Sequence, residues 1–315
     1  MNGLGTKSKG NTPAGRPLNG RSPAAGDSRP DLSAIVVTHN RTELALATLA
    51  SARAAADGVA VQWLVVDSGS SDDTPEAIER RFPDVQLLRA ANVGFAAANN
   101  LALALARGRY VLLLNPDVEI ASGTFAELIA LLDARPRVGV ASVIQRGGEG
   151  ELQYSIRRYP SPLRAFGEAL APGGLPGLRR WGEEERNAAR YREERSADWL
   201  VGAFLIARAE VVAQIGGLDE RFFLYSEETD WCYRARAAGW DVRHLPQMAV
   251  VHHNTPTARP DLVAQLSYAK LLFARKHYRR VRAAAIRAAL ALRHGMRAQR
   301  RAFAVVTGFA PPPFE

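Results

Sequence analysis

Residues 111–117 read Val-Leu-Leu-Leu-Asn-Pro-Asp, and this stretch decides the fold. Its apolar run is typical of a buried strand that stops at a proline and places Asp117 at its carboxyl end. Residues 34–40 and 62–73 have the same design, an apolar run that ends in polar groups. In open α/β sheets, ligands bind outside the carboxyl ends of the strands. We therefore expect three strands to present polar side chains at one edge of a sheet.

Short apolar runs alternate with helical segments from residue 31 to about residue 140. This alternation predicts βαβ units and a mainly parallel sheet. The expected strands are 31–38, 61–67, 85–88, 110–114, 138–144, 198–206, 242–245 and 249–252. The expected helices are 42–56, a helix beginning near residue 75, 96–106, 123–134, 209–214 and 227–238.

The 315 residues divide by composition into three parts. Residues 1–30 are rich in Gly, Pro, Ser and Asn, and we expect a disordered tail because such a segment cannot offset the entropy of ordering. Residues 31–255 form the α/β domain, in which Gly, Pro and charged residues at 147–195 predict a mobile insertion. Residues 256–315 combine apolar residues and arginines at helical spacing, which predicts a basic helical extension.

Charge and cysteine content bear on location and partners. The net charge of +9 is explained by arginine-rich usage and does not require a nucleic-acid partner. After Asp261 no acid occurs before Glu315, so the surplus charge lies in the extension, which either packs as a solvated helix or binds an anionic membrane surface. The single cysteine, Cys232, agrees with a reducing cytoplasm, and no uncharged apolar stretch is long enough to span a bilayer. We expect a cytoplasmic protein, either free or peripheral on the inner face of the membrane.

Two common nucleotide-binding patterns are absent from the sequence. The dinucleotide fingerprint needs G-x-G-x-x-G directly after the first strand, but residues 38–41 read Thr-His-Asn-Arg and the next glycine is Gly58. The phosphate-binding pattern G-x-x-x-x-G-K-[ST] does not occur either. Hydride transfer and P-loop chemistry are therefore disfavoured.

Five segments in order, 35–41, 65–72, 92–100, 114–117 and 216–230, resemble the motifs of family 2 glycosyltransferases. The resemblance covers roughly residues 31–280. It implies the GT-A fold, a Rossmann-like, mixed and mainly parallel sheet flanked by helices. The Asn-Val-Gly-Phe segment at 92–95 and the Leu-Asn-Pro-Asp segment are similar to the rhamnosyltransferase branch, whose donor is commonly dTDP-rhamnose. Inverting transfer to a glycan or lipid-linked glycan acceptor in cell-surface polysaccharide synthesis is the implied activity.

The resemblance also implies a set of residues that bind the nucleotide-sugar. Asp67 would accept a hydrogen bond from the N3–H of uracil or thymine, unless it only starts the turn before Gly69. Asn99 or the neighbouring Asn100 would reach the donor, with helix capping or burial as an equal alternative. The implied binding residues are Thr38, His39, Asn40, Arg41, Asp67, Ser68, Gly69, Asn92, Gly94, Asn99 and Asn115.

A divalent metal, Mg²⁺ or Mn²⁺, is the implied cofactor. Asp117 holds the position of the family's metal-binding acid, and hard cations prefer carboxylate oxygen. Asn115 stands where the family's first acid would be, which argues against direct metal binding by that residue. His252, or His253 beside it, falls where related enzymes supply a further ligand, although a structural histidine is an equal alternative.

An acid cluster at Glu227, Glu228 and Asp230 opens a predicted helix. Complementarity to the helix dipole and an Asp230–Arg234 pair would explain two of these acids without any catalytic role. The resemblance implies that Glu228 is the catalytic base, with Glu227 or Asp230 as alternatives because the family usually has Asp at the second position. Two further alternatives stay open: the same chemistry with UDP-galactofuranose or a UDP-hexose, and a non-catalytic nucleotide-binding homologue.

Overall fold

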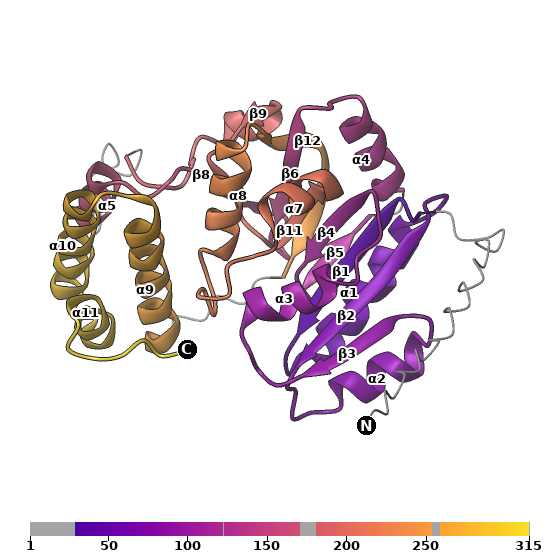
Figure 1. Cartoon of the computed structure of the whole chain (residues 1–315), viewed down its shortest axis with the longest axis horizontal. Helices are drawn as coiled ribbons and strands as arrows, with labels where there is room; N and C mark the ends of the chain where they lie inside the picture. Colours follow the sequence, from indigo (N-terminus) through magenta and orange to yellow (C-terminus); the bar gives the residue numbers. More distant parts are fainter. Residues whose placement is uncertain (1–28, 122, 171–180, 254–258, 315) are drawn as a thin grey trace, which may run out of the picture.

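The structure is a computed structural model that describes residues 29–121, 123–170, 181–253 and 259–314. Within these residues a ten-stranded sheet has the order β3-β2-β1-β4-β11-β6-β12-β5, with β7 on β6 and β9 on β12 (Figure 1). The main strands are β1 Leu32–Thr38, β2 Val61–Ser68, β3 Gln86–Ala90, β4 Tyr110–Leu114, β5 Val118–Ile120, β6 Val138–Arg146, β11 Phe204–Arg208 and β12 Asp241–His252. The short strands are β7 Leu152–Gln153, β8 Ile156–Arg157, β9 Arg195–Ser196 and β10 Trp199–Leu200.

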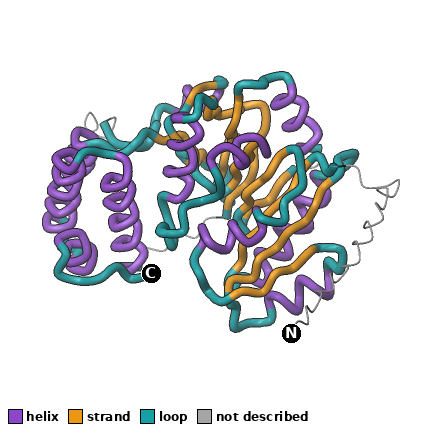
Figure 2. The backbone as a smooth tube through the Cα atoms, in the orientation of Figure 1, coloured by secondary structure: helices purple, strands orange, loops and turns teal. Residues whose placement is uncertain are grey.

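Helices flank the sheet and continue beyond it in a separate group. Figure 2 shows the strands as one central layer with helices against them, and a helical group beside that layer. The helices of the α/β domain are α1 Thr42–Ala55, α2 Thr74–Arg81, α3 Phe95–Leu103, α4 Thr124–Asp133, α5 Pro162–Leu170, the 3-10 helix η1 Ala188–Arg192, α7 Ala209–Ile215 and α8 Glu227–Ala237. The extension contains α9 Pro260–His277, α10 Arg280–Met296 and α11 Arg300–Thr307.

Parallel pairing aligns the ends of the first strands. β1 pairs in parallel with both β2 and β4, with Thr38 opposite Asp67 and Val36 opposite Leu114. β11 then runs antiparallel to β4 and β6, while β12 is parallel to β6. The sheet is therefore mixed and mainly parallel, as predicted, and the carboxyl ends of β1, β2 and β4 meet at one edge.

Each face of the sheet has its own apolar core. On one face α1, α2 and α4 bury side chains such as Leu49, Ile78 and Phe125 against the strands. On the other face α3, α7 and α8 bury side chains such as Ala98 and Trp231. Nearly continuous burial along β1, β2 and β4 follows from this double covering and explains why these strands have no alternating pattern.

The extension forms a third core. Helices α9, α10 and α11 pack with α5 around Ala165, Ile286, Leu290 and Val306. Figure 1 shows this helical group beside α8, on the side of the molecule away from β3. In the described ranges no helix is long and apolar enough to cross a bilayer.

Two strand predictions were wrong in detail. The strand expected at 198–206 is divided: β10 pairs with β8 and only β11 joins the main sheet, because the chain turns at Gly202 and Ala203. The two strands expected at 242–245 and 249–252 are one strand, β12. Its register shifts between Leu245 and Ala249, where Pro246 has no N–H to donate, so the pairing is interrupted while the chain stays extended.

Two other segments differ from a simple βα alternation, and one expectation lies outside the described residues. β5 was not predicted, because three residues are too few for a pattern. In the segment expected as a mobile insertion, 147–195, the described residues form β7, β8, α5, η1 and part of β9, whereas 171–180 lie outside the described residues. The tail expected to be disordered, 1–30, lies outside them too, except for Arg29 and Pro30.

Candidate functional site

A cleft of about 490 Å³ lies at the carboxyl ends of β1, β2 and β4. Eight of the predicted site residues line it: Thr38, His39, Arg41, Ser68, Asn92, Gly94, Asn115 and Asp117. The other lining residues are Val37, Phe95, Pro116, Phe223, Leu224, Arg259, Leu262 and Phe314. The structure thus brings together residues that lie more than two hundred positions apart in the sequence.

Buried oxygens without hydrogen-bond partners gather at this edge. Thr38 Oγ1, Asp67 Oδ1, Ser68 Oγ and Asp117 Oδ1 are buried, and no described residue is hydrogen-bonded to them. Buried polar atoms are nearly always paired, since an unpaired one costs about 1–3 kcal/mol. Four such atoms at one sheet edge indicate a surface built to bind a polar ligand.

The loop after β1 forms hydrogen bonds that hold the loop after β2 in place. The second oxygen of Asp67, Oδ2, accepts a hydrogen bond from the backbone N–H of Ser70 at 3.1 Å. Asn40 Oδ1 accepts from the N–H of Ser71 at 2.7 Å, and the Nδ1 of His39 lies 2.8 Å from the carbonyl oxygen of Ser68. Asp67 therefore forms the turn and still keeps one free acceptor, while Asn40 and His39 support the loop.

Glycines allow two close backbone contacts beside the cleft. Gly94 has φ 87°, and a Cβ placed there would lie 2.6 Å from the carbonyl oxygen of Phe223. Gly69 has φ 74°, and its Cβ would lie 2.9 Å from the backbone nitrogen of Asn92. Both φ values are ones that L side chains rarely adopt, so these positions require glycine to bring the chain segments together.

Asp117 and His252 face each other across β5 and β12. The Nε2 of His252 lies 3.4 Å from Oδ1 of Asp117. Nδ1 of His252 lies 2.9 Å from Oε1 of Gln153, whose amide also donates to the His252 carbonyl at 2.8 Å. This amide orientation makes Nδ1 the donor to Gln153, and Nε2 is the ring nitrogen that faces Asp117. The pair has the chemistry of two metal ligands with a supporting hydrogen bond behind the imidazole.

His253 is oriented differently from His252. Its Nε2 lies 3.1 Å from Oε1 of Glu119, and its backbone N–H donates to the carbonyl of Asp117 at 2.8 Å. Across the described ranges no group of three or more His, Cys, Asp or Glu side chains is placed to hold a metal ion. Any ion at Asp117 and His252 would thus complete its shell with ligand oxygens and water.

Two glutamates open α8, of which Glu227 is buried and Glu228 is half-buried. The loop before them contains Tyr225 at φ 73° and Ser226 at φ 67°, strained values that are most frequent at functional sites. Burial, with the neighbouring charge of Glu228, raises the pKa of Glu227 well above its ordinary value. Burial also raises the pKa of Glu228. Oε2 of each residue has no hydrogen-bond partner in the described part of the chain, so both carboxyls can accept or release a proton.

Asp230 lies in an ion-pair network that joins α8 to α9. Its Oδ1 is 2.5 Å from Nζ of Lys276 and 2.6 Å from Nε2 of His277. Its Oδ2 accepts from Nε of Arg234 at 2.8 Å, the i,i+4 pair expected from the spacing. Burial opposes ionisation, yet these three donors lower the pKa of Asp230 below its ordinary value. The arrangement supports a structural role for Asp230 and favours the glutamates as proton acceptors.

Neither asparagine of α3 lines the cleft. The amide of Asn99 is buried and donates to the carbonyl of Phe95 at 2.8 Å. Asn100 donates to the carbonyl of Leu218 at 2.8 Å and accepts from its N–H at 2.9 Å. Asn99 is thus buried and Asn100 half-buried, and both pair with backbone groups.

Sequence reasoning missed the part of the cleft that comes from the extension. Arg259 and Leu262, at the start of α9, line the cleft beside Asp117. Phe314 also lines it and stacks on Phe223, with ring centroids 5.8 Å apart and planes at 19°. Nothing local in the sequence marks these residues, because only the folding back of the extension brings them to the sheet edge.

Comparison with known proteins places the chain in context. The family model described as Glycosyl transferase family 2 matches residues 33–190. An N-acetylglucosaminyl-diphospho-decaprenol L-rhamnosyltransferase of Mycobacterium tuberculosis (strain ATCC 25618 / H37Rv) is 31% identical over 219 residues, which are 66% of this chain and 71% of the relative. Rhamnosyltransferase WbbL of Escherichia coli (strain K12) is 22% identical over 51% of this chain and 61% of its own.

Solved structures share the fold at low sequence identity. The mannosyltransferase PcManGT from Pyrobaculum calidifontis, solved with GDP-Man and Mn²⁺, has a TM-score of 0.54 at 18% identity over 90% of this chain and 74% of its own. Residues 1–349 of TarS from S. aureus, solved with UDP-GlcNAc, have a TM-score of 0.51 at 16% identity over 89% and 75%. These neighbours are GT-A glycosyltransferases, which confirms the predicted GT-A fold.

Proposed function

The chain belongs to glycosyl transferase family 2, and from that premise we propose that it transfers L-rhamnose from dTDP-rhamnose to a lipid-linked glycan acceptor. That it is a nucleotide-sugar-dependent glycosyltransferase follows from the family and its relatives. The finer proposal of donor and acceptor is supported by the Mycobacterium tuberculosis relative, whose name states both a rhamnosyl group and a diphospho-decaprenol acceptor. We place the reaction in cell-surface polysaccharide synthesis.

The unpaired oxygens at the strand ends carry this proposal. Oδ1 of Asp67 would accept the N3–H of thymine, and the hydroxyl groups of Thr38 and Ser68 would contact the base and ribose. Arg41 and Arg259 line the same cleft and are exposed, so that their charge can face a diphosphate.

Asp117 and His252 would hold a divalent metal, Mg²⁺ or Mn²⁺, which neutralises the charge of the diphosphate leaving group when bound. Asn115 lines the cleft beside them and keeps its N–H bonded to the carbonyl of Ala203 at 2.9 Å. Its amide carries no charge, so we assign the side chain to the donor and not to the metal.

Glu228 is the proposed general base. As it removes the proton of the acceptor hydroxyl, that oxygen attacks the anomeric carbon from the face opposite the diphosphate, which inverts the configuration. A Cβ added at Gly202 would lie 3.4 Å from Cβ of Glu228, so the glycine leaves space beside the base. In the transition state the sugar ring carries positive charge and resembles an oxocarbenium ion.

We also propose that the basic extension attaches the protein peripherally to the cytoplasmic face of the membrane. A lipid-linked acceptor lies at that surface, and attachment would reduce the search for it to two dimensions. The run of arginines after Asp261 without an intervening acid supports this attachment.

Thermal unfolding in the presence of Mg²⁺ and candidate donors tests the proposed donor. At a hundredfold excess over Kd, dTDP-rhamnose is expected to raise the Tm by about 5 °C, since a ligand that binds only the folded state stabilises it. UDP-galactofuranose, UDP-hexoses and GDP-mannose serve as matched controls. A larger shift with one of these, together with transfer of its sugar, would reassign the donor.

Asp67→Asn is expected to weaken binding of dTDP about 10- to 100-fold, because a hydrogen bond to a charged acceptor is lost. The amide oxygen can still accept the N–H of Ser70, so the turn and the Tm should be unchanged. Titration calorimetry of dTDP and UDP into mutant and parent measures the effect. Equal affinities would assign Asp67 to the turn alone.

A further inference from the structure

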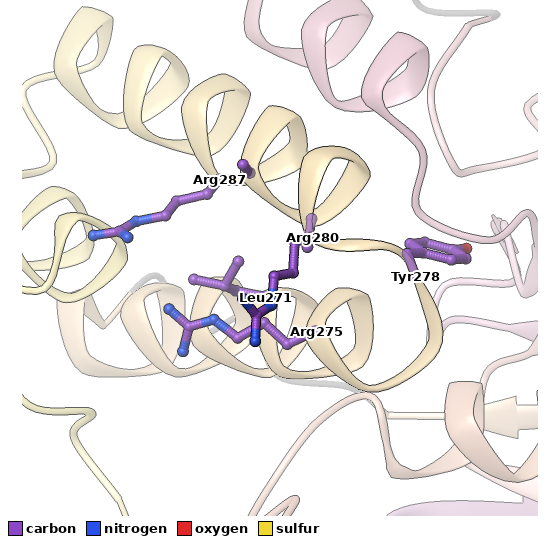
Figure 3. Close-up of a pocket in the computed structure, with 7 residues that line it drawn as sticks. Leu271, Arg275, Tyr278, Arg280 and Arg287 are labelled. Atoms are coloured by element: carbon purple, nitrogen blue, oxygen red, sulfur yellow. The ribbon is translucent and has the colours of Figure 1, made fainter.

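A second hollow lies between α9 and α10 and shares no residue with the cleft at the sheet edge. Its volume is about 330 Å³ (Figure 3). Three of its lining residues are arginines and none is acidic: the set is Leu271, Arg275, Tyr278, Arg280, Ala283, Ala284 and Arg287. The hollow is therefore strongly positive.

Within the described ranges no acidic side chain pairs with Arg275 or Arg280. The side chains of Arg275 and Arg280 are exposed, and neither side chain makes a hydrogen bond or ion pair with a described residue. Figure 3 shows Arg280 reaching from the start of α10 toward α9, along which Arg275 lies. Residues 262–314 contain no acid, and Asp261 at the start of α9 pairs with Arg301, which does not line the hollow.

The third arginine is fixed in position by neutral groups. Arg287 donates from Nε to the carbonyl of Val306 at 2.8 Å and from Nη2 to the carbonyl of Thr307. These bonds hold the guanidinium at the carboxyl end of α11 without neutralising its charge. Because Nε and one Nη2 hydrogen are used by these carbonyls, Nη1 and the second Nη2 hydrogen remain as the donors that a phosphate oxygen could accept.

Two apolar side chains flank the arginines and face solvent. Val281, next to Arg280, is 83% exposed, and Phe309, two residues after Thr307, is 84% exposed. These are the highest exposures among the large apolar side chains of the described residues. Apolar groups beside arginines are typical of surfaces that enter the boundary between head groups and acyl chains.

We propose that this hollow binds the phosphate of an anionic phospholipid head group while Val281 and Phe309 enter the membrane boundary. The hollow is open and larger than a phosphate group, as a lipid head group requires. The inference deepens the membrane attachment proposed above by assigning it to one site. It is tested by binding alone, without donor or acceptor, so its failure leaves the transferase proposal intact.

Co-sedimentation of the full chain with vesicles at physiological salt provides the test. Arg275→Gln/Arg280→Gln is expected to lower binding to vesicles of phosphatidylglycerol and phosphatidylcholine about 10- to 30-fold. The matched control, Arg81→Gln/Arg300→Gln, removes equal charge from two exposed arginines that do not line the hollow. It should lower binding less than about 3-fold, because exposed charges away from the contact are screened. Equal losses in both pairs would overturn the proposal in favour of diffuse attraction.

A second pair of measurements separates a lipid from a soluble phosphate. Val281→Ser/Phe309→Ser should weaken vesicle binding but leave any stabilisation by inorganic phosphate unchanged. If phosphate raises the Tm through Arg275 and Arg280 while vesicle binding does not depend on them, the ligand is a soluble phosphate and the lipid assignment is wrong. Equal pelleting of the parent with phosphatidylcholine alone would also overturn it. Circular dichroism of each variant verifies its fold.

Discussion

Asp117→Ala is expected to lower metal-stimulated sugar transfer about 10³-fold or more, because a bound divalent ion contributes several kcal/mol to the departure of the diphosphate. Oδ1 of Asp117 is buried, has no hydrogen-bond partner in the described part of the chain and lies 3.4 Å from Nε2 of His252. Removing it leaves one protein ligand. Transfer at increasing Mn²⁺ and Mg²⁺, together with calorimetric titration of Mn²⁺ in the presence of dTDP, measures the loss.

Glu119→Ala is the matched control for Asp117→Ala. Glu119 is two residues away, but it pairs with His253 at 3.1 Å and does not line the cleft. The variant should keep metal-stimulated transfer near the level of the parent. A folded Asp117→Ala protein with the metal dependence of the parent would show that the ion is held elsewhere or is not required.

The sheet edge was predictable because its signal is local. The apolar runs before Thr38, Ser68 and Asn115 are each long enough to be buried strands, and helices between them enforce parallel pairing. The carboxyl ends of parallel strands must then meet. The sequence therefore predicts the strand ends that line the cleft.

Contacts between distant segments were not predictable in the same way. The pair of Asp230 with Arg234 follows from i,i+4 spacing, but Lys276 and His277 reach the same carboxylate from another helix. Phe314 stacks on Phe223 only because the extension folds back over the cleft. Neither contact has a periodic pattern, since each depends on how two separately formed units pack.

These distant contacts give the extension a further part in the site. Lys276 also pairs with Asp219 at 2.6 Å, so one lysine ties α9 both to the loop before α8 and to α8 itself. Glu227 and Glu228 lie in the first turn of that helix. The orientation of the proposed base is therefore coupled to the same extension that carries the arginine-lined hollow.

Glu228→Gln is expected to lower transfer about 10²- to 10⁴-fold, the usual contribution of a positioned general base, while dTDP and metal affinity are retained. The amide is nearly isosteric with the carboxyl group, so the fold should be kept. Burial raises the pKa of Glu228, and a base is active only when deprotonated. The kcat/KM of the parent should therefore fall, as the pH decreases, at a higher pH than for an ordinary carboxylate. Single-turnover transfer with saturating donor, measured against pH, tests both expectations.

The Glu227→Gln variant distinguishes the role of Glu227 from that of Glu228. Burial is the main reason why the pKa of Glu227 is raised in the folded protein. The contribution of Glu227 to the free energy of unfolding is therefore complete below its pKa in the unfolded chain, and it is lost as the pH rises through its pKa in the folded protein. The Glu227→Gln protein should therefore have a higher Tm than the parent at neutral pH, with a smaller difference near pH 4, while it keeps most of its transfer activity. If Glu227→Gln is inactive and Glu228→Gln is active, the base is Glu227. Loss of activity in both variants would instead show that the pair acts as one unit that shares a proton.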